Sequence, residues 1–282
     1  MYDYQNKPAK ETSQIDSPAS EISIHRRTVP IQDPGLEEER RNCLAILDEA
    51  ISKLQNKNLS ADTKNKIREI FEGSTSQSKI KTSRFKDELL LRFEYMRRRL
   101  SSARFFYNKD YSAYSPTTTA YVHSQETSNI AINITNYYIE QMGTPFNLMT
   151  LLHEVSHFSD IKRKPKWDKL YRESGTEDYF YASDPMTDDT QEYIQKSIAG
   201  LGKFYNKMND IEYSKSIGRP KGLSRLKTAL NNADHIALLA LNLGKEKVKE
   251  AQYIDFSKRH PIVQRIIKEQ QARREARRNA GN

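Results

Sequence analysis

The segment LLHEVSHFSD, residues 151–160, contains two histidines and a glutamate within five residues. On a helix of about 3.6 residues per turn, His153 and His157 lie one turn apart on one face, with Glu154 beside them. Neutral imidazoles are good zinc ligands, and a neighbouring carboxylate could deprotonate a metal-bound water. The pattern predicts a metal site; two histidines on a solvated helix are the alternative.

A helix is expected to position these side chains. Thr144 suits the N-cap, and Pro145 suits the first helical position. Apolar residues at helical spacing define a core-facing stripe, and the two histidines fall outside it, as ligands facing a cleft should. The stripe consists of Leu148, Leu151, Leu152, Val155 and Phe158.

A catalytic zinc site usually keeps three protein ligands and one open position. The metzincin spacing would place a third histidine at position 163, which is Arg163 here, so that class is excluded. On chemistry alone Glu173, Glu177 and Glu192 are all candidates for the third ligand. A more informative stretch is SGTEDYFYASD, residues 174–184.

Here the sequence resembles the aspzincins, the deuterolysin and peptidyl-Lys metalloendopeptidase family, whose HExxH motif precedes a GTxDxxYG motif. The resemblance implies His153, His157 and Asp178 as ligands of one catalytic Zn²⁺, Glu154 as general base and Tyr181 as donor to the developing oxyanion. It implies a zincin-like fold and zinc-dependent endopeptidase activity on protein substrates. A Lys preference after the scissile bond would need an acidic pocket, for which the candidates are Asp184, Asp188 and Asp189.

The resemblance extends over roughly residues 36–245. AYV and IAINI resemble the strands that precede the active-site helix, and ALNNADHIALLALN resembles the family's closing Asn-Asn-Ala-Asp helix. Two features depart from the family: Ala182 replaces a glycine, and the basic segment within residues 158–174 lengthens the gap before Asp178. Ala182 matters if that turn requires a positive φ.

The elements expected around the site give a mainly helical α+β fold. Periodicity predicts helices at about 36–55, 60–72, 82–106, 187–212 and 222–243, and β-rich stretches predict two short antiparallel strands within 117–135. We expect a disordered polar leader over residues 1–35, the metalloprotease domain over 36–245 and a basic helical tail over 246–282. The middle segment is expected to fold without the other two.

Composition limits the function classes. Of the formal charge of +9, the segment 246–282 contributes +5. No stretch approaches about 20 apolar residues, so no membrane span is expected. The tail could touch nucleic acid or an anionic membrane, but its mixed charge favours a solvated helix end. No zinc-finger, RNA-binding or helix-turn-helix pattern accompanies the charge, which argues against a nucleic-acid-binding protein. We expect a monomer.

The single cysteine, Cys43, permits no internal disulfide, so the fold does not require an oxidising compartment. With the polar leader and the family resemblance, this favours a bacterial effector or toxin that is secreted or injected without a classical signal peptide. A cytoplasmic protease is the alternative location. The rival function is a catalytically silent, zincin-fold adaptor that holds a partner with its basic tail.

Overall fold

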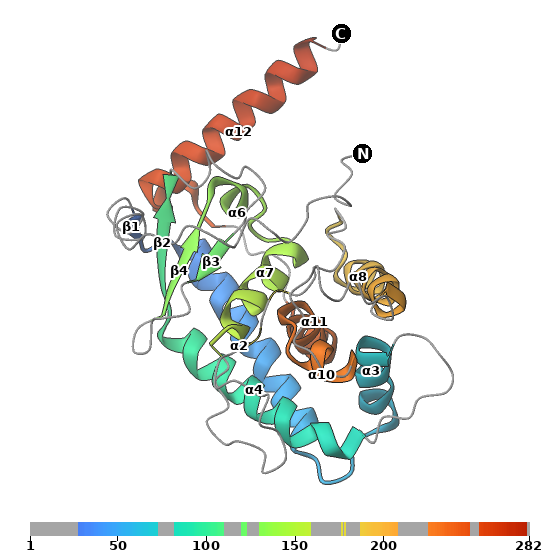
Figure 1. Ribbon diagram of the computed structural model, residues 1–282. Helices are drawn as coiled ribbons and strands as arrows, with labels where there is room; N and C mark the ends of the chain where they lie inside the picture. The colour runs from blue at the N-terminus through green and yellow to red at the C-terminus, as the bar shows by residue number, and fades with distance from the viewer. Residues whose placement is uncertain are drawn as a thin grey trace, which may run out of the picture.

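The computed structural model describes residues 28–72, 82–109, 120–122, 130–158, 176, 178, 187–207, 225–248 and 254–280. They form helices packed around the buried helix α11, with a small sheet at one side (Figure 1). The expectation of a mainly helical α+β fold is confirmed. Among the described residues, no helix has both the length and the apolar character that crossing a bilayer requires.

The sheet is four-stranded and mixed, in the order β1-β2-β4-β3. Strand β1 (Thr28–Ile31) runs antiparallel to β2 (Arg104–Asn108), and β3 (Ala120–Val122) runs antiparallel to β4 (Ala131–Ile134). The two central strands, β2 and β4, are parallel, with Phe105 opposite Ile132.

The sheet corrects three sequence expectations. The two antiparallel strands predicted within 117–135 are present as β3 and β4, but the small sheet that contains them is mixed, because the β2–β4 pair is parallel. Residues 28–31 were assigned to a disordered leader but form β1, which buries Ile31 and places Pro30 on an edge strand, where a missing N–H is tolerated. The predicted helix 82–106 ends at Ser102, and its last two phenylalanines, Phe105 and Phe106, lie in β2.

The predicted helices before and after the sheet are present. Helix α2 (Pro34–Gln55) begins at Asp33, whose carboxylate accepts hydrogen bonds from the N–H groups of Gly35 and Leu36. The helix predicted over 222–243 is divided at Asn231 and Asn232 into α10 and α11. The bounds are α3 (Ala61–Glu72), α4 (Thr82–Ser102), α6 (Asn136–Glu140), α7 (Pro145–Ser156), α8 (Thr190–Lys207), α10 (Arg225–Leu230) and α11 (Ala233–Gly244).

The core lies where α2, α7 and α11 meet. Every residue of α11 is buried, so this helix is covered on all sides. Its last residue, Gly244, packs directly on α2, where an added Cβ would collide with the backbone of Ile46. The close approach of α11 to α2 matters for function because both helices hold α7 in place.

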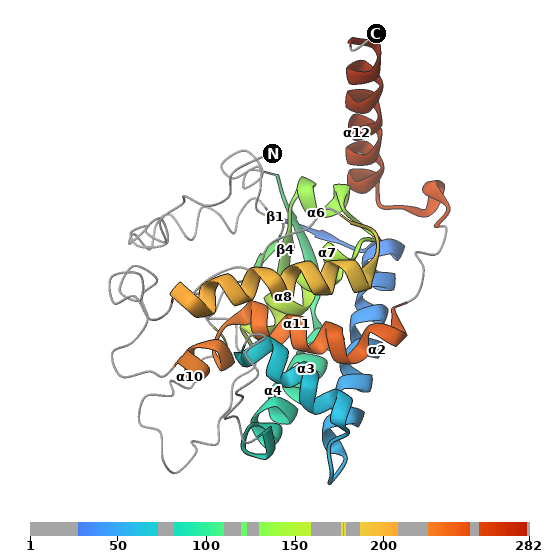
Figure 2. The ribbon, with the colours of Figure 1, turned by 90° about the vertical axis from the view of Figure 1, so that its right-hand side faces the viewer.

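The C-terminal segment is fastened to the start of α2. After the short 3-10 helices η2 (Lys245–Lys247) and η3 (Phe256–Lys258), the Arg259 guanidinium forms 2.9 Å contacts with both carboxylate oxygens of Asp33. Helix α12 (Pro261–Ala280) follows, and its first turns bury Val263 and Ile266. Beyond them it extends away from the rest of the protein (Figures 1 and 2).

Candidate metal centre

The centre is built on α7, which carries His153 and Glu154 and has His157 as its C-cap. Thr144 is at the N-cap position as expected, but its hydroxyl donates to the Gln141 carbonyl rather than capping the helix. The histidine side of α7 is covered, unlike the open cleft that the sequence suggested: His153 is only 7% exposed and Met149 only 4%.

A buried carboxylate fixes the start of α7. Glu39 of α2 accepts hydrogen bonds from the Tyr138 hydroxyl at 2.7 Å, the Gly143 N–H at 2.8 Å and the Asn147 amide at 3.3 Å. Gly143 has φ of 89°, a left-handed conformation that favours glycine. Burial raises the pKa of Glu39 to about 7, although these hydrogen bonds and Arg259 act to lower it. The turn between α6 and α7 is therefore tied to α2.

His153 is oriented from the opposite side by α11. Its Nδ1 lies 2.5 Å from Oδ1 of Asp234, which is in the first turn of α11 and is 6% exposed. Because a carboxylate accepts hydrogen bonds, the proton on this ring belongs on Nδ1, and Nε2 keeps its lone pair when the imidazole is neutral. The contact selects the ring nitrogen that faces the centre.

His157 is oriented in the same manner by a backbone carbonyl. Its Nδ1 donates to the Thr176 carbonyl at 2.8 Å, which again leaves Nε2 as the nitrogen with a lone pair. Thr176 is itself held to α7, because its hydroxyl lies 2.7 Å from the Ser156 hydroxyl and its N–H donates to the Ser156 carbonyl at 3.3 Å. The segment that carries Asp178 is thereby docked on the end of the helix.

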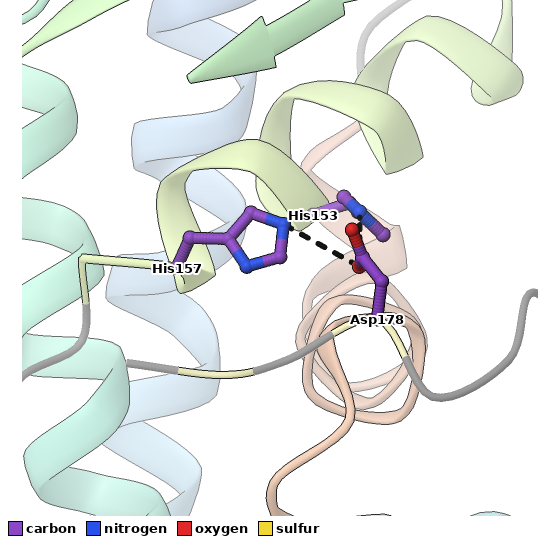
Figure 3. Close-up of side chains that lie close together, drawn as sticks. All are labelled: His153, His157 and Asp178. Atoms are coloured by element: carbon purple, nitrogen blue, oxygen red, sulfur yellow. Dashed lines mark ion pairs between the residues drawn. The ribbon is translucent and has the colours of Figure 1, made fainter. Parts of the chain in front are cut away.

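Both Nε2 atoms approach the carboxylate of Asp178 (Figure 3). Oδ1 of Asp178 lies 3.1 Å from Nε2 of His153 and 3.4 Å from Nε2 of His157, and one ligand atom from each residue lies within 4.8 Å of the others. Two imidazole lone pairs and a carboxylate are all electron-rich, so they gather stably only around a proton or a cation. Tetrahedral zinc with bonds of about 2.0–2.1 Å separates its ligands by roughly 3.3 Å, which fits the two distances from Asp178 to the histidines.

The electrostatics of α7 follow from its burial. Burial would lower the pKa of His153, but the carboxylates of Asp178 and Asp234 raise it well above its ordinary value. Burial lowers the pKa of His157. Burial also raises the pKa of Glu154 to about 8; nearby His153 lowers it, and Asp178 and Asp234 add to the rise. The helix thus presents a weakly acidic carboxyl beside the histidines.

The other predicted site residues divide into two groups. Tyr181 and Asp184 lie outside the described residues, as do two of the alternative ligands, Glu173 and Glu177. The third, Glu192, is exposed on α8, where its carboxylate pairs with Lys196 and accepts from Thr187. It does not join the histidines.

Two of the acidic pocket candidates are visible at the start of α8. Asp188 and Asp189 are both exposed. The Asp189 carboxylate accepts a hydrogen bond of 2.6 Å from the Glu192 N–H, the arrangement of a helix N-cap. The structure therefore gives Asp189 a local capping contact, and the suggested Lys pocket stays a prediction.

Sequence reasoning assigned no role to Asp234 or Thr176, the two groups that orient the histidine rings. Both lie in segments quoted for the family resemblance, but Asp234 is separated from His153 by 81 residues. A histidine ligand generally donates its second ring N–H to a carboxylate or carbonyl. This tendency predicts that such partners exist. Identifying them requires the packing of α11 on α7, which brings Asp234 to His153, and the docking of Thr176 on the end of α7.

No family model and no curated protein sequence matches this chain. Its fold is similar to that of a solved zinc peptidase from Grifola frondosa, with 18% sequence identity and a TM-score of 0.43. The match covers 74% of this chain and 93% of that one. At this identity and TM-score the likeness assigns neither a family nor an activity to the chain.

Proposed function

We propose that the chain is a zinc-dependent endopeptidase with His153, His157 and Asp178 as the metal ligands. The convergence of the two Nε2 atoms on Asp178, with both Nδ1 atoms already engaged by Asp234 and Thr176, carries this proposal. Two imidazoles and one carboxylate are an established donor set for catalytic zinc. The motif resemblance described above supports the same ligands.

The peptide chemistry assigned to this centre rests on Glu154. A bound zinc ion would supply Lewis acidity, which polarises a carbonyl and lowers the pKa of water. Glu154 follows His153 on α7, and the positive charge of a bound zinc ion would lower its pKa and favour the carboxylate. As a carboxylate it would accept a proton from the attacking water and return it to the leaving amine. Tyr181 is proposed as the donor to the oxyanion. A Lys preference would draw on Asp184, Asp188 and Asp189.

Metal analysis of the purified full chain tests the ligand set. We expect about one zinc per chain, and we expect Asp178→Ala to reduce zinc binding strongly because one of three ligands is lost. Glu192→Ala, which removes an exposed carboxylate on α8, is the matched control and should retain zinc. Normal zinc content in Asp178→Ala would reject Asp178 as a ligand.

A protease assay then separates the enzyme from a silent adaptor. Zinc-loaded protein should cleave an unstructured protein such as casein, and a chelator should stop the cleavage. A peptide library read by mass spectrometry would show whether Lys follows the cleaved bond. Zinc binding without cleavage of any library peptide would favour the adaptor.

Delivery as a secreted or injected effector remains part of the proposal. Cys43 is buried and is not in a disulfide, so the described core needs no oxidising compartment. We therefore expect cleavage to be unchanged in a phosphine reductant, which does not carry zinc-binding thiols, as work in a reducing cytosol would require. Loss of activity on reduction would contradict that use.

A further inference from the structure

The outer half of α12 carries a stripe of arginines. Residues 271–280 are all exposed and correspond to a helical rod of about 15 Å that leaves the body of the protein (Figure 2). At 100° per residue, Arg273, Arg274, Arg277 and Arg278 fall within an arc of about 140°. Glu275, the single acidic residue of this half, lies outside that arc.

The stripe continues the face with which α12 is anchored. Val263 and Ile266, which are buried, project within the same arc about two to four turns earlier. The face is therefore apolar where it packs on the protein and changes to arginine where the helix leaves it.

Only the inner end of the stripe is neutralised. Arg273 pairs with Glu140 of α6 at 2.5 Å. Among the described residues, Arg274, Arg277 and Arg278 have no ion pair, so three guanidinium groups face solvent on one side of a supported rod. The whole of α12 holds six basic and two acidic residues, a net charge of +4.

We propose that this arginine stripe, Arg274, Arg277 and Arg278 with Arg273 at its base, docks on the phosphates of double-stranded DNA. Guanidinium groups bind phosphate through paired hydrogen bonds. An α-helix about 10–12 Å across fits the major groove of B-DNA, which is about 12 Å wide, whereas the major groove of RNA duplexes is narrow and deep. Residues 271–280 contain no bulky apolar side chain, which a helix embedded in a membrane surface requires.

The proposal departs from the expectation drawn from the sequence, which argued against nucleic acid from the mixed charge of the tail and the absence of known motifs. Phosphate contacts need no motif, because they require only cations placed along a surface. The stripe lies on α12, away from α7, and DNA binding goes beyond the proposed peptidase activity. DNA binding would hold the enzyme near DNA-bound protein substrates. The affinity for DNA should be the same in zinc-free and zinc-loaded protein.

Fluorescence anisotropy with the full chain and a labelled duplex of about 20 base pairs, roughly two helical turns, tests the proposal. The stripe variant removes the three unpaired arginines while keeping helix propensity, with the substitutions Arg274→Gln, Arg277→Gln and Arg278→Gln. The control variant, Lys57→Gln, Arg104→Gln and Lys109→Gln, removes three exposed positive charges elsewhere. Only the stripe variant should lower the slope of log affinity against log salt, by about 2.7, or about 0.9 for each lost phosphate contact.

Four results would overturn the proposal. The first is failure of the full chain to bind the duplex at about 50 mM salt, and the second is an equal loss of DNA affinity in the stripe and control variants. The third is tighter binding to an RNA duplex than to DNA, and the fourth is tighter binding to phosphatidylserine vesicles than to DNA at matched phosphate. Circular dichroism of each variant must match wild type. Unchanged binding in the zinc-free protein separates this result from any failure of the peptidase proposal.

Discussion

At the scale of single residues, the centre depends on which atom of each ring is left available. His153 and His157 are ordinary imidazoles, but Asp234 and the Thr176 carbonyl hold their Nδ1 atoms and turn both Nε2 atoms toward Asp178. The selection of ring nitrogens, more than the spacing of two histidines along a helix, makes the cluster suitable for a metal.

Glu154→Gln should separate metal binding from catalysis. Glutamine keeps the shape and helix propensity of glutamate but cannot accept a proton from water, so zinc content should stay near wild type. Cleavage should fall by roughly 10²–10⁴ or more, the range for losing general acid–base assistance. The comparison is kcat/KM on one peptide together with metal content, with Glu192→Gln as control. Equal cleavage by wild type and Glu154→Gln would refute the role given to Glu154.

Asp234→Asn should weaken zinc binding without unfolding the protein. The amide can still accept the Nδ1–H of His153 but lacks the charge that makes the imidazole a stronger ligand, and such changes typically cost 10- to 100-fold in metal affinity. Competition with a chromophoric chelator measures this loss. Asp62→Asn is the control, since Asp62 is also in the first turn of its helix, where the helix dipole favours an acid. Matching zinc affinities in the two variants would show that Asp234 does not tune the ligand.

At the scale of elements, Glu39 makes the attachment of α7 depend on pH. Its carboxyl has a pKa of about 7 in the folded protein and an ordinary value of 4.5 when exposed. Between these values the folded state keeps a proton that the unfolded state has lost, so Glu39 lowers stability as pH rises from about 4.5 to 7. The total effect is about 3 kcal/mol.

Glu39→Gln should remove this slope. Urea unfolding at several pH values should show wild type losing stability relative to the variant between pH 5 and 7, with little further change above pH 8. Glu69→Gln, a change at an exposed glutamate of α3, should follow wild type. Parallel curves for wild type and Glu39→Gln would mean that the buried carboxyl ionises without penalty.

Local signals in the sequence predicted most helices and missed the long-range pairing. The start of α2 after Asp33 and the Thr144-Pro145 start of α7 follow from capping chemistry within a few residues. The end of α4 was missed because no glycine or proline marks it, and Phe105 and Phe106 continue an apolar run into β2. The parallel β2–β4 pair and the His153–Asp234 contact join distant segments, which short-range patterns cannot specify.

At the scale of the whole molecule, the boundaries drawn from sequence cut through the core. A segment 36–245 would lose Asp33 with its partner Arg259, strand β1, and the buried Val263 and Ile266. Removing these parts should destabilise the protein by several kcal/mol, since each buried apolar side chain contributes about 1.5–3 kcal/mol. We therefore expect the segment 36–245 not to fold alone, contrary to the expectation drawn from the sequence.

Two truncations of the full chain test this. Ending the chain after Lys245 should lower the melting temperature substantially or prevent folding. Ending it after Gln270 removes the exposed residues 271–280 of α12, with the surface ion pair between Arg273 and Glu140. It should leave the melting temperature within about 2 °C of wild type, because surface changes and surface ion pairs typically contribute little. Arg259→Met in the full chain isolates the buried pair, whose disruption is expected to cost about 3–5 kcal/mol. If the chain that ends at Lys245 were as stable as wild type, the C-terminal segment would not contribute to the stability of the fold.

The ion pair between Asp33 and Arg259 joins residues that are made early and late in synthesis, so it determines when the fold can be completed. A ribosome adds roughly 5–20 residues per second, so roughly 5–20 s separate the appearance of His157 from that of Arg259. Until Asp234 has been made, His153 lacks the carboxylate that orients its ring. Until Arg259 has been made, Asp33 at the start of α2 lacks its partner. The oriented His153 ring and the anchored start of α2 can therefore coexist only after the chain has been made through Arg259.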